Sequence, residues 1–239
     1  MDNLSIIHED NHIIVVIKPM GVPSQEDASG DPDMLTIIKQ YRKTNEGKEG
    51  SAYVGLVHRL DRVTGGVMVF AKTSKAAARL SAQLQDGGFA KKYLAVLSGV
   101  PRERVGTLEH YLLKNERLNK VDVVGAAVSG AKRAELNYRV RTIAADNTLV
   151  EIDLITGRSH QARVQMATMG TPIYGDNKYG KNERGGLALW AHELQFTHPT
   201  TTDRMRFVVN PPEDGVWAQF DFARKSHKTK DTPPTEEQI

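Results

Sequence analysis

The stretch LVEIDLITGRSHQARVQMATMG, residues 149–170, carries the pattern that decides the fold. Its first seven residues alternate between apolar and acidic side chains, which predicts a strand with one buried face. A Thr-Gly turn follows, and a helix is expected from about His160 to Met169 because Gly170 is a typical helix terminator. The stretch therefore predicts a strand, a turn and a short helix in succession.

Further strands and short helices are expected toward the N-terminus. Apolar runs predict strands over 66–71 and 91–99. A helix between them starts at Thr73 or Ser74 as its cap and ends at a Gly-Gly pair, and a shorter helical pattern covers 34–43. Several strands follow one another through hairpin-like turns, without the regular spacing of βαβ units. We therefore expect an α+β fold with a mixed, largely antiparallel sheet flanked by helices and loops.

The bulk composition is that of an ordinary globular protein. The chain has 239 residues, 39% of them hydrophobic and 26% charged, which is enough to bury a large core. We expect a single domain over 1–222 and a polar, disordered tail over 223–239. No apolar run reaches the length of a membrane span, and the N-terminus lacks a secretory signal, so no membrane association is expected.

Charge and cysteine content narrow the function classes. The chain has no cysteine, which excludes disulfides and thiol catalysis and fits a cytoplasmic protein. The formal net charge is +3, which permits a polyanionic partner without requiring one. Only 6% of the residues are aromatic, so extended base-stacking platforms are not expected.

A zinc-protease pattern, H-E-x-x-H, occurs at residues 8–12. On a helix His8 and His12 would share one face and bind zinc, with Glu9 as the general base. The β-branched residues on both sides and the central Asp-Asn turn pair predict a hairpin instead. A hairpin places the two histidines on opposite arms, so we expect no metal site.

The stretch LVHRLDRVTGG, residues 56–66, concentrates charge between apolar strands. A buried carboxylate is costly unless a cation or hydrogen-bond donors accompany it. Because Arg59 and Arg62 flank Asp61, this stretch is either a functional site or a surface loop with a local ion pair.

A second charged cluster lies at the start of the helix expected near residue 160. Its polar residues are Arg158, His160, Gln161 and Arg163. A helix start offers free backbone N–H groups and a positive dipole end, which suit an anion. Simple helix capping with a solvated face is the alternative, but two guanidinium groups within six positions favour contact with phosphate.

These stretches resemble, in order, the motifs of the RluA-type RNA pseudouridine synthases: HRLDRVTGG, KKYLAVLSG, TGRSHQARV and PIYGDNKYG. HEDNHIIVVIKPMGVPS and LALWAHELQFTHPTTTDRMRFVVNPP are similar to the opening and closing strands of that family, so the resemblance runs from about Ile6 to about Pro212. It implies the catalytic domain of these enzymes, which detach uracil from ribose, turn it and rejoin it through C5. This isomerisation is redox neutral, so the resemblance implies no cofactor and no metal.

The resemblance also implies roles for individual residues. Asp61 matches the catalytic aspartate, which acts on the ribose or the base of the target uridine or abstracts a proton at C2′. Arg163 matches the basic residue that pairs with it, and Arg158 is a second choice for that role. Tyr93 matches a tyrosine that stacks on the base and is a candidate for handling the C5 proton. Arg59 matches a residue that can fill the gap left when the nucleotide is flipped out.

The remaining polar residues of the two clusters are expected to contact the RNA backbone or to support the loop: Arg62, Arg158, His160 and Gln161. The RNA is either ribosomal or transfer RNA, with ribosomal RNA favoured by the distribution of the family, and the default oligomeric state is a monomer. Two other classes remain as alternatives. One is a non-catalytic RNA-binding protein on the same fold, and the other is a hydrolase that pairs Asp61 with His58.

The sequence departs from the family pattern in several places. Gly65 stands where serine is frequent, and Gln165 and Trp190 stand where histidine is common. Many members also carry an N-terminal S4-type RNA-binding module, whereas this sequence begins at the catalytic hairpin. We therefore expect selection of the RNA to come from the catalytic domain and the basic segment 224–230.

Overall fold

The computed structural model describes residues 4–46, 52–181, 183 and 185–222, and its framework is one eleven-stranded sheet. The elements in chain order are β1 (Ser5–Glu9), β2 (Ile13–Lys18), α1 (Met34–Asn45), β3 (Gly55–Leu56), β4 (Gly65–Ala71), α2 (Ser74–Gln85), β5 (Ala90–Ser98), β6 (Val105–Asn115), β7 (Lys120–Val124), β8 (Lys132–Ala144), β9 (Asn147–Leu154), α3 (Gln161–Thr168), β10 (Leu189–Thr197), β11 (Arg204–Val208) and the 3-10 helix η1 (Gly215–Gln219). Every expected strand and helix is present, with ends shifted by a few residues at most.

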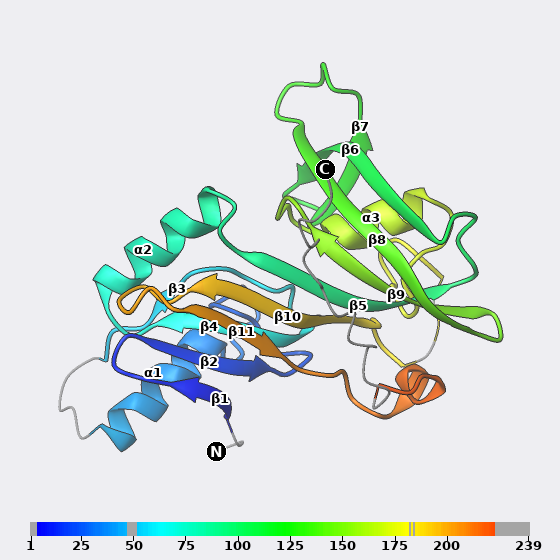
Figure 1. Ribbon diagram of the computed structural model, residues 1–239. Helices are drawn as coiled ribbons and strands as arrows, with labels where there is room; N and C mark the ends of the chain where they lie inside the picture. The colour runs from blue at the N-terminus through cyan, green and yellow to red at the C-terminus, as the bar shows by residue number, and fades with distance from the viewer. Residues whose placement is uncertain (1–3, 47–51, 182, 184, 223–239) are drawn as a thin grey trace, which may run out of the picture.

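The predicted α+β fold with a mixed, largely antiparallel sheet is confirmed. The strand order is β1-β2-β4-β10-β5-β9-β8-β6-β7, and β3 and β11 pair with β4 and β10. Among the described strands, β4 and β10 form the one parallel pair, and the other pairs are antiparallel. In Figure 1, β5 crosses the molecule and joins an N-terminal half with α1 and α2 to a second half with β6–β9 and α3.

The hairpin expected at the N-terminus is confirmed. Strands β1 and β2 pair antiparallel, and the Asp10 carboxylate accepts hydrogen bonds from the backbone N–H groups of His12 at 2.6 Å and Ile13 at 2.9 Å. This local bonding is the reason aspartate is favoured in such turns. His8 lies on β1 and His12 precedes β2, so the helical geometry of a zinc-protease motif does not form.

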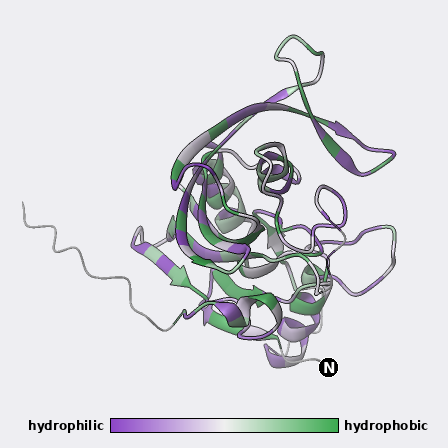
Figure 2. Ribbon diagram, turned by 90° about the vertical axis from the view of Figure 1, so that its right-hand side faces the viewer, coloured by the Kyte–Doolittle hydropathy of each residue, from purple (hydrophilic) through white to green (hydrophobic). Residues whose placement is uncertain are grey.

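The core of the N-terminal half lies on both faces of its sheet. Strand β2 is buried on both sides: Ile14 and Val16 belong to a cluster that includes Ile38 of α1, and Ile13 belongs to a cluster that includes Leu80 of α2. The two helices therefore cover opposite faces, as the continuous apolar sequence of β2 requires. Figure 2 shows the hydrophobic residues gathered in these central strands.

The second half contains long strands that the sequence analysis left unassigned. Strands β6, β7 and β8 form antiparallel pairs that project from the sheet and curve around α3 (Figures 1 and 2). A small cluster of Leu112, Val121, Ala134 and Val164 packs α3 against these strands. The second half therefore holds the start of α3 against the outer hairpins.

The predicted tail over 223–239, with its basic segment 224–230, lies outside the described residues. Among the described helices, none is long and apolar enough to cross a membrane.

Candidate active site

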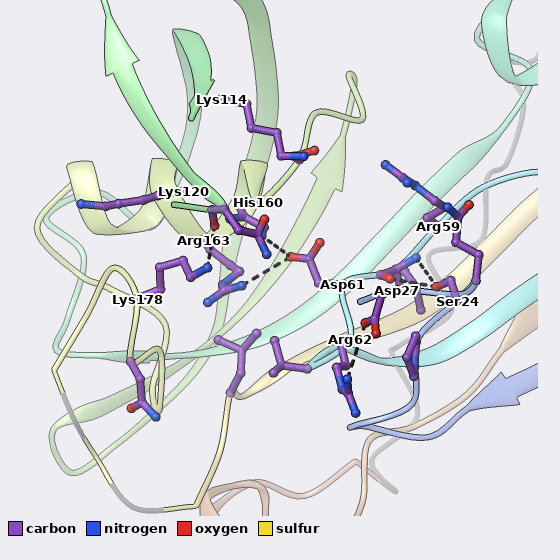
Figure 3. A pocket seen from close by; sticks show the side chains of 18 of the residues that line it. Ser24, Asp27, Arg59, Asp61, Arg62, Lys114, Lys120, His160, Arg163 and Lys178 are labelled. Carbon is purple, nitrogen blue, oxygen red and sulfur yellow. Dashed lines mark hydrogen bonds and ion pairs between the residues drawn. The ribbon is translucent and has the colours of Figure 1, made fainter. Parts of the chain in front are cut away.

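Asp61 lies in the loop between β3 and β4, where two cavities of about 900 Å³ and about 740 Å³ meet. Four of the predicted site residues line both cavities: Arg59, Asp61, His160 and Arg163. They come from the β3–β4 loop and from the start of α3, on the two halves of the molecule. Figure 3 shows Arg163 and His160 approaching Asp61 from one side and Arg59 lying on the other.

A fully buried lysine at the end of β2 fixes the loop that carries Asp61. The Lys18 ammonium group donates hydrogen bonds to three backbone carbonyl oxygens: those of Pro19 at 2.9 Å, Val22 at 2.6 Å and Arg62 at 3.1 Å. Burial lowers the pKa of Lys18 to about 8, and the nearby charge of Asp61 opposes that shift. Lys18 thereby joins the turn after β2 to the loop after β3.

Arg62 fixes the same loop from outside. It donates from Nε to the carbonyl oxygen of Gly21 at 2.9 Å, and its guanidinium forms ion pairs with Asp27 at 3.5 Å and with Asp31. Arg62 therefore pairs with the 21–31 loop and not with Asp61, so the ion pair between neighbours that the sequence suggested does not form. This placement favours loop support as the role of Arg62.

The ion-pair partner of Asp61 on α3 is Arg163, the first of the two arginines considered. One terminal nitrogen of its guanidinium lies 3.5 Å from Asp61 Oδ2. Its Nε and the other terminal nitrogen each donate to Asp176 at 2.8 Å. Such a two-point pair fixes the plane of a guanidinium. Arg163 therefore has a fixed orientation toward Asp61.

Asp176 is the fixed anion of this arrangement, with a side chain that is 0% exposed. Its Oδ1 also accepts hydrogen bonds from the backbone N–H groups of Lys178 at 3.0 Å and Tyr179 at 3.2 Å. Burial tends to raise the pKa of Asp176, but the hydrogen bonds and charge of Arg163 outweigh it and hold the pKa below its usual value.

His160 is the second group beside the Asp61 carboxylate. Its Nε2 lies 3.9 Å from Asp61 Oδ2, and its Nδ1 lies 2.7 Å from the hydroxyl oxygen of Tyr179. Burial lowers the pKa of His160 below its usual value, and the charge of Asp61 partly opposes that shift. The imidazole is therefore neutral at pH 7 and presents one donor and one acceptor.

Tyr93 comes from the centre of the sheet. It lies on β5, beside Ile152 of β9 and Ala191 of β10, and it lines the second cavity together with Asp61. It is buried, and burial together with the charge of Asp61 raises the pKa of its phenol well above the usual value. Tyr93 therefore carries its proton at neutral pH.

The other predicted residues occupy different positions around the cavities. Arg59 is exposed, and Arg158 lines the second cavity while its Nε donates to the carbonyl oxygen of Arg133 at 3.0 Å. Gln161 is only 2% exposed. Its amide accepts from the Thr156 hydroxyl at 2.7 Å and donates to the Glu135 carbonyl at 2.9 Å. Gln161 nevertheless lines the second cavity, so both roles expected for it, RNA contact and support of the loop, stay predictions.

His58, the partner considered for a hydrolase, is used elsewhere. Its Nε2 accepts a hydrogen bond from the backbone N–H of Val69 at 3.2 Å. Burial lowers its pKa to about 3, so the ring stays neutral at ordinary pH. The structure therefore gives Asp61 the partners Arg163 and His160, and it uses His58 to support β4.

Two departures from the family pattern, Gly65 and Trp190, occupy the same space and are sterically linked. A Cβ atom on Gly65 would lie 2.4 Å from Cζ3 of Trp190, so the indole ring occupies the space that a serine side chain would need. The indole is held in that space because its Nε1 donates to the carbonyl oxygen of Val209 at 3.0 Å. The third departure, Gln165, is fully buried and donates to the backbone of Leu108 at 3.0 Å.

We expect Gly65→Ser to destabilise the protein by about 2 kcal/mol, because overpacking a closed site costs roughly that much. Trp190→His alone leaves a cavity and is also destabilising. The double variant should lose less stability than the two single losses added together, since Trp190→His removes the clash of Gly65→Ser, and the serine side chain fills part of the cavity left by the indole. Urea unfolding of the four proteins measures this coupling. Strict additivity would contradict the steric explanation.

The site and fold together are those of an RNA-modifying isomerase. Residues 12–168 match the family described as RNA pseudouridylate synthase. The chain belongs to this family and is an RNA pseudouridine synthase, which confirms the resemblance to the RluA type.

Individual relatives support the same assignment. The chain is 32% identical over 224 residues to ribosomal large subunit pseudouridine synthase D of Zymomonas mobilis, across 88% of this chain and 70% of that protein. It is 34% identical over 222 residues to ribosomal large subunit pseudouridine synthase C of Escherichia coli K12, across 88% of this chain and 67% of that protein. Its fold is similar to that of human RNA pseudouridylate synthase domain containing 4, with a TM-score of 0.75, 24% identity and 90% coverage of both chains.

The sequence analysis missed several residues of the site. It assigned no role to Lys18, although a lysine at the end of an otherwise apolar strand is a signal of unusual burial. It recognised the motif PIYGDNKYG as one of the family but assigned no role to Asp176 or Tyr179 within it. It also missed three lysines that line the first cavity: Lys114, Lys120 and Lys178. These come from the strands and loops of the second half, whose place beside Asp61 depends on the tertiary fold.

Proposed function

We propose that this enzyme isomerises specific uridines of large-subunit ribosomal RNA to pseudouridine, with Asp61 as the catalytic residue. The observation that carries the proposal is the position of Asp61 at the junction of the two cavities, with Arg163 and His160 both on its Oδ2. The choice of RNA is supported by the names of the two bacterial relatives, which are both ribosomal large subunit enzymes.

The two partners of Asp61 suit a nucleophilic or basic carboxylate. Such a group acts as an anion, and Arg163 places a positive charge 3.5 Å from its Oδ2. Both partners lie near Oδ2, and among the described residues none hydrogen bonds to Oδ1. Oδ1 is therefore the oxygen available to the target uridine, whether it acts at the ribose or the base.

Tyr93 is proposed to stack on the target base in the second cavity. Leu154 and Leu189 also line this cavity and give it apolar wall, which suits a flat uracil ring. Because its raised pKa keeps the phenol protonated, Tyr93 can take up the C5 proton only if its own hydroxyl proton passes at the same time to solvent in the second cavity. A phenolate base is not required in this proposal.

Arg59 is proposed to stack in the place that the flipped nucleotide leaves. A uridine within an RNA helix cannot reach Asp61, so it has to be extruded at a cost of a few kcal/mol. Arg59 is exposed at the mouth of both cavities, where a guanidinium plane can replace the lost stacking. Arg158, at the rim of the second cavity, is proposed to contact the RNA backbone.

The lysines of the first cavity are proposed to bind RNA phosphates. Lys114 lies on β6, Lys120 on β7 and Lys178 on the loop before β10, around the same opening as Arg163 (Figure 3). The first cavity thus presents a basic wall beside the catalytic carboxylate, as a phosphate backbone requires.

We expect Lys114→Ala and Lys120→Ala each to weaken RNA binding several-fold at low salt. Each variant should reduce the slope of log affinity against log salt by about one, because one phosphate contact is lost. Lys39→Ala, on the exposed side of α1 and outside both cavities, is the matched control. Filter binding to unmodified ribosomal RNA at several salt concentrations measures the slopes. An unchanged slope in both variants would place the RNA elsewhere.

The substrate is tested by tritium release from RNA labelled at uracil C5. Separate pools of unmodified ribosomal and transfer RNA are given to the wild-type enzyme. Release from the ribosomal pool alone supports the proposal, and release from the transfer RNA pool alone replaces the substrate while keeping the enzyme class. No release from either pool, or from assembled ribosomal precursor particles, would contradict the proposal.

A monomer in the cytoplasm is the accompanying expectation, and sedimentation of the pure protein tests the oligomeric state.

A further inference from the structure

We propose that Tyr179 is a positioning residue of the active site, whose hydroxyl group fixes the tautomer of His160 so that the Nε2–H bond faces Asp61. The backbone N–H of Val121, on β7, holds that hydroxyl group in place. The inference rests on the proposed role of Asp61 and assigns the function of two side chains around it.

The hydrogen bonds around the Tyr179 hydroxyl determine where its proton goes. The oxygen accepts a hydrogen bond from Val121 N–H at 2.7 Å, and it lies 2.7 Å from His160 Nδ1. A tyrosine hydroxyl has one proton to donate, and Nδ1 of a neutral imidazole can accept it. With Nδ1 as the acceptor, the ring proton of His160 is on Nε2.

The other side of the His160 ring supports the same tautomer. Nε2 lies 3.9 Å from Asp61 Oδ2, and an ionised carboxylate can only accept hydrogen bonds. A proton on Nε2 is therefore favourable there, whereas a lone pair on Nε2 would face the negative charge. The distance is longer than a hydrogen bond, as is common in catalytic groups before the substrate is bound.

The backbone of His160 is held in an unfavourable conformation. Its φ angle is 51°, in the left-handed region that non-glycine residues rarely adopt. Such strain costs of the order of 1 kcal/mol or more and persists only where the surroundings impose it. Here it turns the imidazole at the start of α3 toward both Tyr179 and Asp61. Among the described residues, His160 makes no side-chain capping bond to α3 that would explain the conformation.

The Tyr179 ring contacts both partners of Asp61. The guanidinium carbon of Arg163 lies 5.3 Å from the ring centroid, and the His160 ring packs edge-on at 5.7 Å. Its neighbour Lys178 donates to the carbonyl oxygen of Asn119 at 2.5 Å, at the tip of the β6–β7 hairpin. The loop of Tyr179 therefore joins this hairpin, with its RNA-facing lysines, to the groups that orient Asp61.

The consequence concerns the orientation of the catalytic carboxylate. Arg163 and an Nε2–H donor on His160 both favour the same oxygen, Oδ2, and leave Oδ1 directed to the substrate. A His160 that carried its proton on Nδ1 would repel Oδ2 and remove this selection. The Tyr179 hydroxyl thus acts through His160 and touches no substrate atom.

The first test is independent of catalysis. Nitrogen-15 NMR of the full-length protein, with the His160 signals assigned from a His160→Asn variant, reports which ring nitrogen carries the proton. We expect a protonated Nε2 and an unprotonated Nδ1 in the wild type, and a mixture of tautomers in Tyr179→Phe. A wild-type ring with its proton on Nδ1 would overturn the proposal, and this result does not depend on whether the uridine target has been identified.

The second test measures single-turnover rates of uridine isomerisation together with RNA affinity. Tyr179→Phe should slow the rate about tenfold or more and change RNA affinity less than threefold. Tyr138→Phe is the matched control, since that hydroxyl also has a backbone partner, the carbonyl oxygen of Glu103 to which it donates at 3.3 Å, but lies outside both cavities. A Tyr179→Phe enzyme that lost affinity or thermal stability while keeping its rate would show a purely structural role and overturn the proposal.

A double variant tests whether Tyr179 acts through His160. Asparagine tolerates the left-handed conformation and has an amide that can still reach the Tyr179 hydroxyl, but it has no group in the place of Nε2. His160→Asn should therefore slow the rate, and adding Tyr179→Phe should slow it no further than about twofold. Full additivity of the two losses would show that the hydroxyl acts independently of the imidazole.

Discussion

Asp61→Asn is expected to abolish isomerisation, with single-turnover rates at least a thousandfold below wild type, while RNA affinity stays within a few-fold. An amide keeps the size and the hydrogen-bonding reach of the carboxylate but is not a nucleophile or a base. The basic cavity walls that we assign to RNA binding are untouched by the change. Tritium release from RNA labelled at uracil C5 measures the rate, and filter binding measures the affinity.

The folded structure should tolerate this change well. Asp61 is 29% exposed, and its partner Arg163 keeps both hydrogen bonds to Asp176 when the carboxylate is replaced. The matched control is Asp203→Asn, which changes an exposed carboxylate outside both cavities and should keep nearly full activity. Turnover by Asp61→Asn above about one per cent of wild type would refute the assigned role. Lost turnover with lost affinity would instead support the non-catalytic RNA-binding class, with Asp61 as an RNA contact.

The fold could be predicted from the sequence where one local pattern dominates. Alternation over 149–155, and capping by Thr73, gave the right elements because these signals act within a few residues. The strand 132–144 was missed although its pattern is clear, since Ala134, Leu136, Tyr138 and Val140 alternate with polar residues and are buried. The strand 105–115 has a weaker pattern, because most of its residues stay at least partly in solvent on the projecting hairpin. A half-exposed strand of that kind has a weak pattern, and its pairing partners supply most of its stability.

The site could be predicted only in part, for a related reason. The charged residues around Asp61 marked the stretch 56–66 only as either a functional site or a loop with a local ion pair, and Arg62 pairs with Asp31 instead. The catalytic role of Asp61 was inferred from the family resemblance. The pairing of Asp61 with Arg163 came from family resemblance, since no spacing rule joins two loops on different halves of a sheet. Tyr179 acts through hydrogen bonds to Val121 and His160, and such contacts depend on the tertiary structure alone.

Asp176→Asn is expected to be the most destabilising single change in the site, costing about 3 kcal/mol of unfolding free energy at pH 7. The variant leaves the buried charge of Arg163 without its counter-ion, and breaking a buried pair in this way typically costs about that amount. The asparagine oxygen can still accept the backbone N–H groups of Lys178 and Tyr179, so the loop itself should persist. Catalysis should fall as well, because Arg163 is no longer fixed toward Asp61.

The pH dependence of this loss separates the charge from the packing. The pKa of Asp176 is lower in the folded protein than in the unfolded chain, so its stabilisation is complete above the unfolded value of about 4. It is lost as the pH falls through the lower folded value. The difference in unfolding free energy between wild type and Asp176→Asn should therefore be large at pH 7 and decrease progressively below about pH 4, as urea unfolding at each pH would measure.

Glu109→Gln, which removes the exposed partner of Arg133, is the matched control and should leave stability nearly unchanged at both pH values. A difference between wild type and Asp176→Asn that stayed constant with pH would mean that Asp176 stabilises the site by shape and hydrogen bonding, and that the charge of Arg163 is neutralised by Asp61 instead.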